Sequence, residues 1–449
     1  MSSAAGEAIR EAVGWQPLVD THEHFVFEDD RNAQPIDFLA GWLGHYASSD
    51  LVSAGMSVAD LEYVRDISKP FAERWAKFAA YWPHVRTTGY GRALLVAARD
   101  LHGVEDIDDS TAEALAEKVA RSNRPGWYRE VLRNRAGIAV SILDVQRNKL
   151  PGEAGFRDVM EADVDRDLFV RSVRFERFIM PRSRKDLRDL EASTDVAIHS
   201  LDDLVEALEV GFERVKARGQ MVAIKNALAY VRSLVWERTT HRDAEEAFLK
   251  ATSHVDELRE RRYPEMGASW DETKPLQDYM MHQTIRLAIE HGLPMQIHTG
   301  LQEGNGNVLT NSRPTDLTNL FLEYPEARFD LFHAGYPWSG EVAALAKNFP
   351  NVYADLCWVH VISPTVGRRV LREWIETIPS NKILAFGGDY LFPEGAYGHA
   401  VLAREGVARV LAETVEDGYL SEADALALVP KLLHDNAAEL FGLWGRLSE

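Results

Sequence analysis

Residues Leu18–His24 read Leu-Val-Asp-Thr-His-Glu-His, an apolar strand that runs directly into a His-x-His motif. Alternate side chains of a strand point to the same side, so both imidazoles can face one metal ion. A His-x-His motif alone arises by chance in many chains. Its meaning therefore depends on which residues end the other apolar runs of the sequence.

Further short apolar runs alternate with amphipathic helical patterns along the chain. Several runs are apolar at successive positions, as in parallel strands that are covered on both faces. This alternation indicates βαβ units, and eight such strands predict a closed (β/α)8 TIM barrel. The predicted strands are Pro17–Asp20, Gly137–Leu143, Ser172–Ile179, Met221–Ile224, Pro294–Ile297, Arg328–Phe332, Asn351–Leu356 and Lys382–Phe386. The clearest helices between the later strands are Leu276–His291, Asp316–Glu323, Gly340–Phe349 and Pro364–Thr377.

One long stretch after the first strand does not fit a minimal barrel. Residues 26–135 are mostly helical in pattern, for example over Phe71–Trp82 and Thr111–Arg121. Insertions in the loops that follow barrel strands lie over the C-terminal face, where the active site is found. We therefore expect a single barrel domain over residues 1–449 with a large helical cap or lid inserted after the first strand. A dimerisation arm is the alternative interpretation of the insertion.

The composition disfavours several classes of protein. The chain has 50 basic and 70 acidic residues, and its net charge of −20 opposes binding to nucleic acid or to an anionic membrane. No apolar run approaches the ~20 residues that span a bilayer, and the N-terminus lacks a signal-peptide pattern. The single cysteine, Cys357, suits a reducing compartment. We expect a cytoplasmic protein with a small-molecule substrate and no nucleic-acid or membrane partner, and homo-oligomerisation stays open.

Polar residues of metal-binding types end several of the predicted strands. His298 ends the fifth strand, His333 ends the sixth, and Asp389 lies just beyond the eighth. Active sites of barrel enzymes are built at these strand ends, so the three side chains are expected to converge with His22 and His24. The sequence therefore predicts a metal-dependent enzyme.

With these residues the chain resembles the amidohydrolase superfamily, in particular its amidohydrolase 2 branch. The resemblance covers His22, His24, His298, His333, Asp389 and the closing segment His434–Phe441. It implies that His22, His24, His298 and Asp389 bind a divalent ion, with zinc expected first and manganese second. It also implies that Asp389 accepts a proton from the activated water in hydrolytic members. His333 would bind a second ion or orient the substrate.

Lys225 ends the fourth strand, where two-metal members of the superfamily carry a carboxylated lysine that bridges both ions. In that interpretation Lys225, His298 and His333 complete a site for two ions. In the alternative, the lysine is unmodified and meets either a carboxylate of the protein or an anionic group of the substrate. The sequence is consistent with one ion or with two.

Candidate substrate-binding residues follow the fifth and sixth strands. The segment Thr299–Asn307 is rich in glycine, which allows close backbone approach, and its amides can bind a polar substrate. Gln302 and Asn305 are its candidates for substrate binding, and Tyr336 and Trp338 are candidates for a pocket wall. Alternatively, the glycine-rich segment is a turn that binds no ligand, and the two aromatic residues serve only in ordinary packing. Arg174 and Arg232 are weaker candidates for holding a carboxylate.

Three functions remain open from the residues. A bound dication lowers the pKa of water to about 7 and polarises a carbonyl group, which suits hydrolysis of an amide (C–N), lactone or ester bond of a small polar substrate. The same ligands can serve a non-oxidative decarboxylase or a uronate-isomerase-like enzyme, which is the alternative. A binding protein on a degraded barrel is disfavoured because the metal-binding residue types are all present in order.

Overall fold

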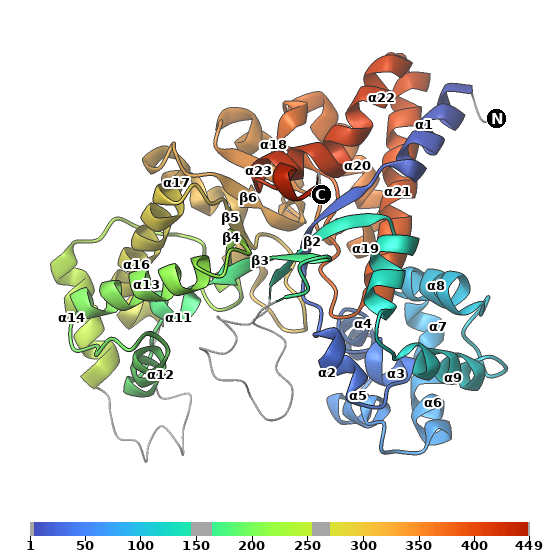
Figure 1. Ribbon diagram of the computed structural model, residues 1–449, viewed down its shortest axis with the longest axis horizontal. Coiled ribbons are helices and arrows are strands. Elements are labelled where there is room, and N and C mark those ends of the chain that lie inside the picture. Colours follow the sequence, from blue (N-terminus) through green and yellow to red (C-terminus); the bar gives the residue numbers. More distant parts are fainter. Residues whose placement is uncertain (1–3, 145–163, 254–269, 448–449) are drawn as a thin grey trace.

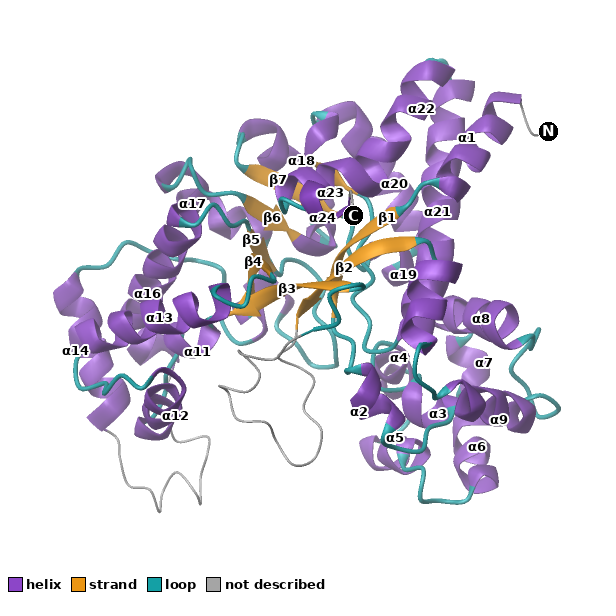
Figure 2. Cartoon of the chain, in the orientation of Figure 1, coloured by secondary structure: helices purple, strands orange, loops and turns teal. Residues whose placement is uncertain are grey.

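Eight parallel strands form the centre of the computed structural model, which describes residues 4–144, 164–253 and 270–447. Each strand pairs with the next one in the sequence, so the order around the sheet runs from β1 to β8 (Figure 2). The strands are β1 (Leu18–Glu23), β2 (Ile138–Asp144), β3 (Phe169–Arg174), β4 (Met221–Asn226), β5 (Met295–Ile297), β6 (Phe329–Leu331), β7 (Val352–Asp355) and β8 (Ile383–Leu384). The predicted TIM barrel is therefore confirmed.

The third strand is displaced from its predicted position. The prediction was Ser172–Ile179, but β3 ends at Arg174 and residues Glu176–Ile179 form the helical turn α11. The apolar residues of that turn are buried, so an apolar run marks them as core without showing whether they are strand or helix. The strand instead starts earlier and includes the buried Arg171, whose charge hides the strand pattern.

Backbone hydrogen bonds between the first and last strands bring the two edges of the sheet together. The Thr21 N–H donates to the Phe386 carbonyl oxygen at 3.2 Å. Beyond the strands, the Asp389 N–H donates to the His22 carbonyl oxygen at 2.8 Å, and the His24 N–H donates to that of Tyr390 at 2.9 Å. These bonds close the barrel at the end where the strands finish.

The C-terminal segment closes the opposite end of the barrel. Ala437, Ala438, Leu440 and Phe441 form one buried cluster with inward-facing residues of the strands, among them Val140 and Ile142. The Asn436 side chain holds this segment to the β8 region, because its Nδ2 donates to the carbonyl oxygens of Ser380 and Ile383 at 2.7 and 2.8 Å. The closing segment of the sequence is thus a plug of the barrel.

Helices surround the barrel on the outside (Figure 1). None of the described helices combines the length and apolar character needed to cross a membrane. The predicted helix Pro364–Thr377 is α20 itself, and Leu276–His291 lies almost wholly within α16. In chain order the elements are α1 (Ala4–Trp15), α11 (Glu176–Ile179), α12 (Arg184–Thr194), α13 (Leu201–Lys216), η3 (Leu228–Tyr230), α14 (His241–Ser253), α16 (Trp270–Glu290), η5 (Leu309–Ser312), η6 (Pro314–Leu317), α17 (Thr318–Glu323), η7 (Phe332–Gly335), α18 (Ser339–Asn348), α19 (Val359–Ile362), α20 (Pro364–Thr377), η8 (Ser380–Lys382), α21 (Pro393–Glu416), α22 (Glu422–Pro430), η9 (Lys431–Asp435), α23 (Asn436–Leu440) and α24 (Trp444–Leu447).

The large insertion between β1 and β2 is helical, as predicted. It forms a group of helices beside α19 and α21 (Figure 1). Its elements are α2 (Glu28–Asn32), α3 (Phe38–Gly41), α4 (Ala47–Ser53), α5 (Val58–Arg65), α6 (Phe71–Ala79), α7 (Trp82–Val85), α8 (Gly89–His102), α9 (Ala112–Ser122) and η1 (Arg129–Arg135). Its role as a cap or lid stays a prediction.

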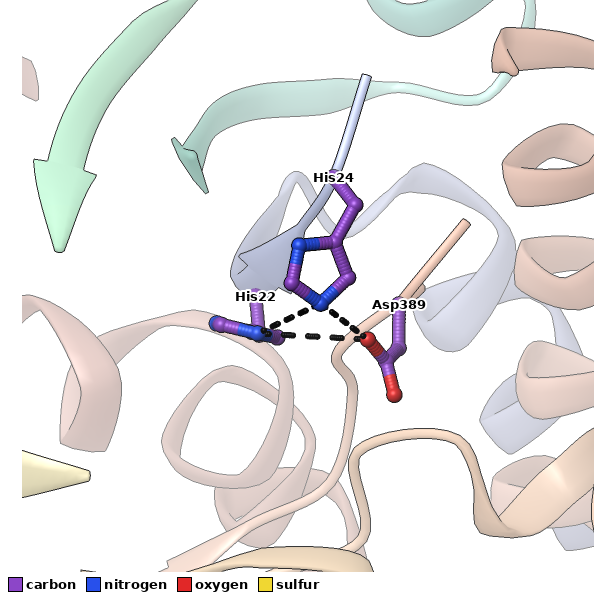
Figure 3. A group of neighbouring side chains, drawn as sticks. All are labelled: His22, His24 and Asp389. Atoms are coloured by element: carbon purple, nitrogen blue, oxygen red, sulfur yellow. Dashed lines mark hydrogen bonds and ion pairs between the residues drawn. The ribbon is translucent and has the colours of Figure 1, made fainter. Parts of the chain in front are cut away.

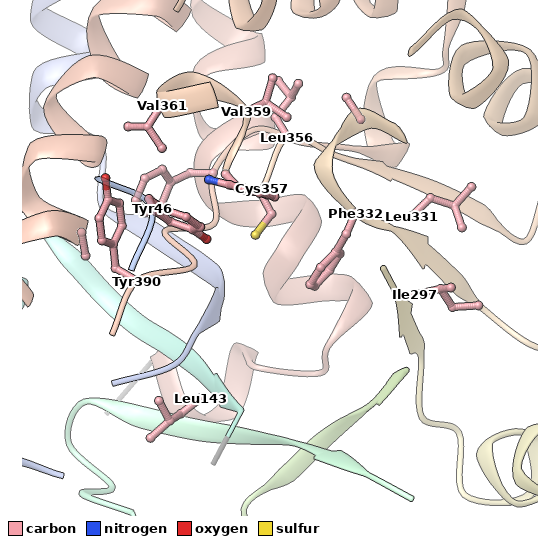
Figure 4. Packing of buried hydrophobic residues seen from close by; sticks show 14 of the residues in the cluster. Tyr46, Leu143, Ile297, Leu331, Phe332, Leu356, Cys357, Val359, Val361 and Tyr390 are labelled. Carbon is pink, nitrogen blue, oxygen red and sulfur yellow. The ribbon is translucent and has the colours of Figure 1, made fainter. Parts of the chain in front are cut away.

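The insertion packs tightly onto α21. A Cβ atom at Gly398 would lie far inside van der Waals distance of the Ala93 backbone, so α8 and α21 cross in direct backbone contact. The buried Arg31 guanidinium pairs with Glu394 at the start of α21, with an Nη2–Oε1 distance of 2.6 Å. Tyr46 of the insertion and Tyr390 beyond β8 belong to one continuous apolar core (Figure 4). The insertion and the barrel therefore share a core.

Substituting Gly398→Ala is expected to lower the free energy of unfolding, because the methyl group forces α8 and α21 apart. Overpacking of this kind costs about 1–3 kcal/mol, which urea unfolding followed by circular dichroism measures. The matched control is Gly14→Ala in α1, where nothing lies within 4 Å of the added carbon. That variant is expected to keep or slightly raise stability. Equal effects of the two substitutions would contradict the close crossing.

Candidate metal centre

Three side chains from the first and last strands converge at the C-terminal end of the barrel (Figure 3). The His22 and His24 Nε2 atoms lie 3.2 Å apart, and the Asp389 Oδ1 atom lies 3.1 Å from His24 Nε2 and 3.9 Å from His22 Nε2. All three residues are buried. Asp389 has a φ of 59°, a left-handed conformation that is uncommon outside glycine and is often found at functional sites.

The atoms that face one another here are hydrogen-bond acceptors. His24 Nδ1 lies 3.4 Å from the Asp144 carbonyl oxygen, and with the ring proton on Nδ1 the Nε2 atom carries a lone pair. That lone pair points at the Asp389 carboxylate, an arrangement that is repulsive unless a cation lies between them. Metal-binding histidines commonly donate their other N–H to a backbone carbonyl in this way. The donor set of two nitrogens and one oxygen fits zinc or manganese.

The charge states of these groups also suit a cation. Burial lowers the pKa of His22 well below its ordinary value, so its imidazole is neutral. Burial alone would raise the pKa of the Asp389 carboxyl, but in the absence of a cation a hydrogen bond from His24 and the positive charges of His24, His333 and His22 when protonated hold it well below its ordinary value. Neutral imidazoles and an ionised carboxylate are the forms that bind a divalent ion.

His298 and His333 form a second pair beside the first group. The Nδ1 atom of His298 faces the Nε2 atom of His333 at 3.1 Å. The outer nitrogen of each ring is bonded to a backbone carbonyl, His298 Nε2 to Leu301 at 2.9 Å and His333 Nδ1 to Cys357 at 3.0 Å. Burial lowers the pKa of His333 to about 4, so this pair again presents lone pairs to each other.

The predicted ligand set is thus distributed over two neighbouring places. His22, His24 and Asp389 have ligand atoms within 4.8 Å of one another, whereas His298 approaches His333 instead of this group. Asp389 connects the two places, because its Oδ2 atom lies 3.8 Å from His333 Nε2. Cys357 also lies near His333 and Asp389, but burial raises the pKa of its thiol well above the ordinary value, which makes it a poor ligand.

Sequence reasoning missed Asp144 as part of this site. It ends β2 with no exposed surface, and its Oδ2 atom lies 3.8 Å from His24 Nδ1. The Arg174 guanidinium binds the same oxygen through Nε and Nη2, both at 2.6 Å. Burial alone would raise the pKa of Asp144, but Arg174, His24 and Lys225 lower it below its ordinary value. The missed signal was an aspartate directly after the predicted strand Gly137–Leu143.

Two adjacent carboxyl groups hold the segment that carries Asp389. Asp20 accepts hydrogen bonds from the Gly388 N–H at 2.9 Å and the Ser141 hydroxyl at 2.8 Å. Glu23 accepts from the Tyr390 N–H at 2.6 Å. Burial raises the pKa of Asp20 to about 6 and that of Glu23 well above its ordinary value, and the two carboxyls hydrogen-bond each other. The backbone on both sides of Asp389 is therefore tied to β1.

A cavity of about 380 Å³ opens beside these residues. Its wall includes His24, His298 and Asp389, together with the charged side chains of Arg174, Glu176, Arg177, Lys225 and Glu303. The insertion contributes His45, which stacks on Tyr46 with a 3.9 Å centroid distance. Tyr46 donates a hydrogen bond from its hydroxyl to the Asp389 carbonyl oxygen. The insertion thus supplies part of the cavity wall and holds Asp389.

The four predicted substrate-binding residues lie outside this cavity wall. The buried Gln302 donates to the Ala229 carbonyl oxygen at 2.6 Å, and the exposed Asn305 donates to that of Ser49 at 3.1 Å. Tyr336 and Trp338 are half-buried and do not line the cavity either. A Cβ at Gly300, which has a φ of 76°, would overlap the backbone after Gly335. The glycine in this loop is thus required by chain packing.

Comparison with known protein sequences identifies related chains. The sequence model of a family described as amidohydrolase matches residues 202–443, more than half of the chain. Protein fluG of Emericella nidulans is 29% identical over 229 residues. The match covers 50% of this chain but 26% of fluG, so the chain spans only part of the length of this curated relative.

Solved structures share the fold over nearly the whole chain. Uronate isomerase from Thermotoga maritima has a TM-score of 0.78 at 17% identity, with 97% of both chains covered. Glucuronate isomerase from Caulobacter crescentus has a TM-score of 0.76 at 18% identity, covering 98% of this chain and 94% of its own. A Lactobacillus casei protein assigned as a metal-dependent hydrolase has a TM-score of 0.65 at 17% identity, with coverages of 98% and 99%. At these identities the similarity establishes the fold alone. Together with the match over more than half of its sequence, the strand order and the converging histidines identify this chain as a member of the amidohydrolase family.

Proposed function

We propose that this chain is a metal-dependent hydrolase that cleaves an amide (C–N), lactone or ester bond of a small polar substrate. The observation that carries the proposal is the group of facing ligand atoms of His22, His24 and Asp389 in and beside the wall of the cavity. A divalent ion held by these residues would supply a Lewis acid that acidifies water and polarises a carbonyl group. Family membership supports an enzyme of this kind, and the reaction type is the proposal.

Asp389 is the residue that we assign to proton transfer. Its carboxylate lies in the cavity wall, and one oxygen faces the histidines of β1 while the other faces His333. An ionised carboxylate in this position can accept the proton of the attacking water and deliver it to the leaving nitrogen or oxygen. The bonds to the His22 carbonyl oxygen and from Tyr46 keep the backbone of Asp389 in place for this step.

His333 is assigned to hold the substrate group next to Asp389. Its Nδ1–H is committed to the Cys357 carbonyl oxygen, so only Nε2 faces the site. With His298 it could instead bind a second ion, which is the two-ion form of the proposal. Element analysis of the purified protein distinguishes one ion from two.

Asp144 and Arg174 are positioning residues in this proposal. Asp144 contacts the outer edge of the His24 ring, and Arg174 neutralises the aspartate from the side of the cavity. A carboxylate beside a metal-binding imidazole orients the ring and raises its basicity. Asp144 and Arg174 would therefore affect metal binding indirectly, by setting the orientation and basicity of the His24 ring.

Substituting Asp389→Asn is expected to lower kcat by about 10²–10⁴-fold, the usual contribution of a positioned acid or base. Substituting His24→Ala is expected to remove the bound ion as well as activity, because one of its three donor atoms is lost. The assay is turnover of a panel of amides, lactones and esters by zinc- or manganese-loaded protein, with metal content measured in parallel. The matched control is His84→Ala, at an exposed histidine of α7 away from the cavity.

Full turnover in Asp389→Asn, with the metal retained, would contradict the assigned proton transfer. Turnover of uronates or loss of carbon dioxide from aromatic acids, with no hydrolysis of the panel, would replace the hydrolase proposal with the isomerase or decarboxylase alternative. Unchanged circular dichroism of the variants shows that the fold is intact.

Substituting Arg174→Met is expected to lower the free energy of unfolding of the metal-free protein by about 3–5 kcal/mol, because the buried Asp144 carboxylate loses its partner. The double variant Arg174→Met/Asp144→Leu removes both charges and is expected to recover most of that loss. Urea unfolding of the three proteins measures the effect. A double variant no more stable than Arg174→Met would show that the loss does not come from the unpaired carboxylate.

A further inference from the structure

Two cationic side chains lie next to each other at the ends of neighbouring strands. Arg174 ends β3 and Lys225 lies near the end of β4, and the two residues are register partners in the sheet. Both line the cavity, and Lys225 is only 2% exposed. Like charges at paired positions of a sheet repel each other, so each requires a nearby anion.

Only one of the two cations forms an ion pair among the described residues; Asp389 and Asp144 act on Lys225 from a longer distance, and neither forms an ion pair with it. Arg174 is bonded to Asp144 through two nitrogens, and its Nη1 lies 3.8 Å from Glu176 Oε2. Lys225 forms no ion pair or hydrogen bond within residues 4–144, 164–253 and 270–447. A buried ammonium group without a partner is costly unless something that enters the cavity neutralises it.

Two other buried carboxyl groups of the barrel, those of Asp330 and Asp355, do not neutralise the Lys225 ammonium group. Asp330 and Asp355 lie close enough to Lys225 to feel its charge, but neither forms an ion pair with it. Burial raises the pKa of Asp330 to about 7 and that of Asp355 well above its ordinary value. The raised pKa values favour the neutral, protonated form of both groups, which weakens their attraction for Lys225.

The Phe332 ring favours an unmodified Lys225 ammonium group over a carbamate on the same nitrogen. The Nζ atom lies 3.6 Å from the centroid of that ring, the geometry of a cation–π contact. The face of an aromatic ring is negative, so it attracts an ammonium group and repels an anionic carbamate on the same nitrogen. The same ring also packs edge-on against His22 at a centroid distance of 4.8 Å, so its position beside Lys225 is held by the metal-site residues.

From this geometry we infer that Lys225 remains an unmodified ammonium group and binds a carboxylate of the substrate. Given the proposed hydrolase function, the substrate is then a small amide or ester that carries a carboxylate at one end. Burial, followed by the Arg174 charge, lowers the pKa of Lys225 to about 8, so the group is still mostly charged at neutral pH. The bond to be cleaved would lie at the His22, His24 and Asp389 end of the cavity.

The test is a pair of small probes that differ in one charge. Succinamate and succinamide have the same length, and only succinamate carries a carboxylate. Isothermal titration of the zinc-loaded full chain is expected to show about tenfold or tighter binding of succinamate, as for a charge-assisted hydrogen bond. Equal binding of the two probes would overturn the inference.

Variants separate Lys225 from the metal as the source of this preference. Lys225→Met is expected to remove most of the preference while metal content stays unchanged, and Lys225→Arg is expected to retain part of it. The matched control is Lys185→Met, at an exposed lysine of α12 that pairs with Asp189. A preference that persists in Lys225→Met would assign the anion site to another residue and overturn the inference.

A measurement on the wild-type protein tests the modification state without any variant. Incubation with ¹³C-bicarbonate followed by ¹³C NMR reports a carbamate on lysine, and none is expected on Lys225. A carbamate signal that Lys225→Met abolishes would overturn the inference. Because probe binding requires no turnover, a failed hydrolase assay with intact probe selectivity would contradict the proposed function alone.

Discussion

The hydrogen bond from the Asp389 N–H to the His22 carbonyl oxygen is the contact on which the centre depends. It joins the end of β8 to the end of β1, and so it closes the barrel and brings the histidines and the aspartate together. Asp20 and Glu23 reinforce it from one side, and the Tyr46 hydroxyl reinforces it from the other. The left-handed backbone of Asp389, which aspartate adopts more readily than most residues other than glycine, is held in place by this ring of contacts.

Burial then decides the chemistry of the side chains. It favours the neutral imidazoles of His22, His298 and His333, while a hydrogen bond from His24 favours the ionised Asp389 carboxyl when no cation is bound. Backbone carbonyls fix which nitrogen of His24, His298 and His333 faces inward. The result is a set of acceptor atoms that repel one another in the absence of a cation. The same burial leaves Lys225 as a cation with no ion pair among the described residues, and the proposals for the cavity therefore place the metal ion at one end and a substrate carboxylate at the other.

Most of the barrel was predictable from the sequence, because strands buried on both faces stand out as short apolar runs between helices. The error at β3 arose because the apolar residues of α11 continue the strand without a break in hydrophobicity. The strand-end positions of His22, His24 and Asp389 were also predictable. The pairing of His298 with His333 depends on ring orientation, and the pairing of Asp144 with Arg174 depends on strand register. Neither is visible in a linear pattern. In the glycine-rich loop, Gly300 is required by close packing against the Gly335–Tyr336 backbone, a demand that sequence cannot separate from substrate binding, and the role of the loop in substrate binding stays a prediction.

The position of the ligands at opposite ends of the chain has a consequence for biosynthesis. During translation His22 and His24 leave the ribosome early, but Asp389 follows only when the last strand has been made. Two histidines alone hold a metal weakly, so the proposed centre is incomplete until β8 and Asp389 have been synthesised. In the proposed centre, loading with the ion would therefore follow the synthesis of β8 (Ile383–Leu384) and accompany folding, and a chain truncated before β8 would lack the third donor.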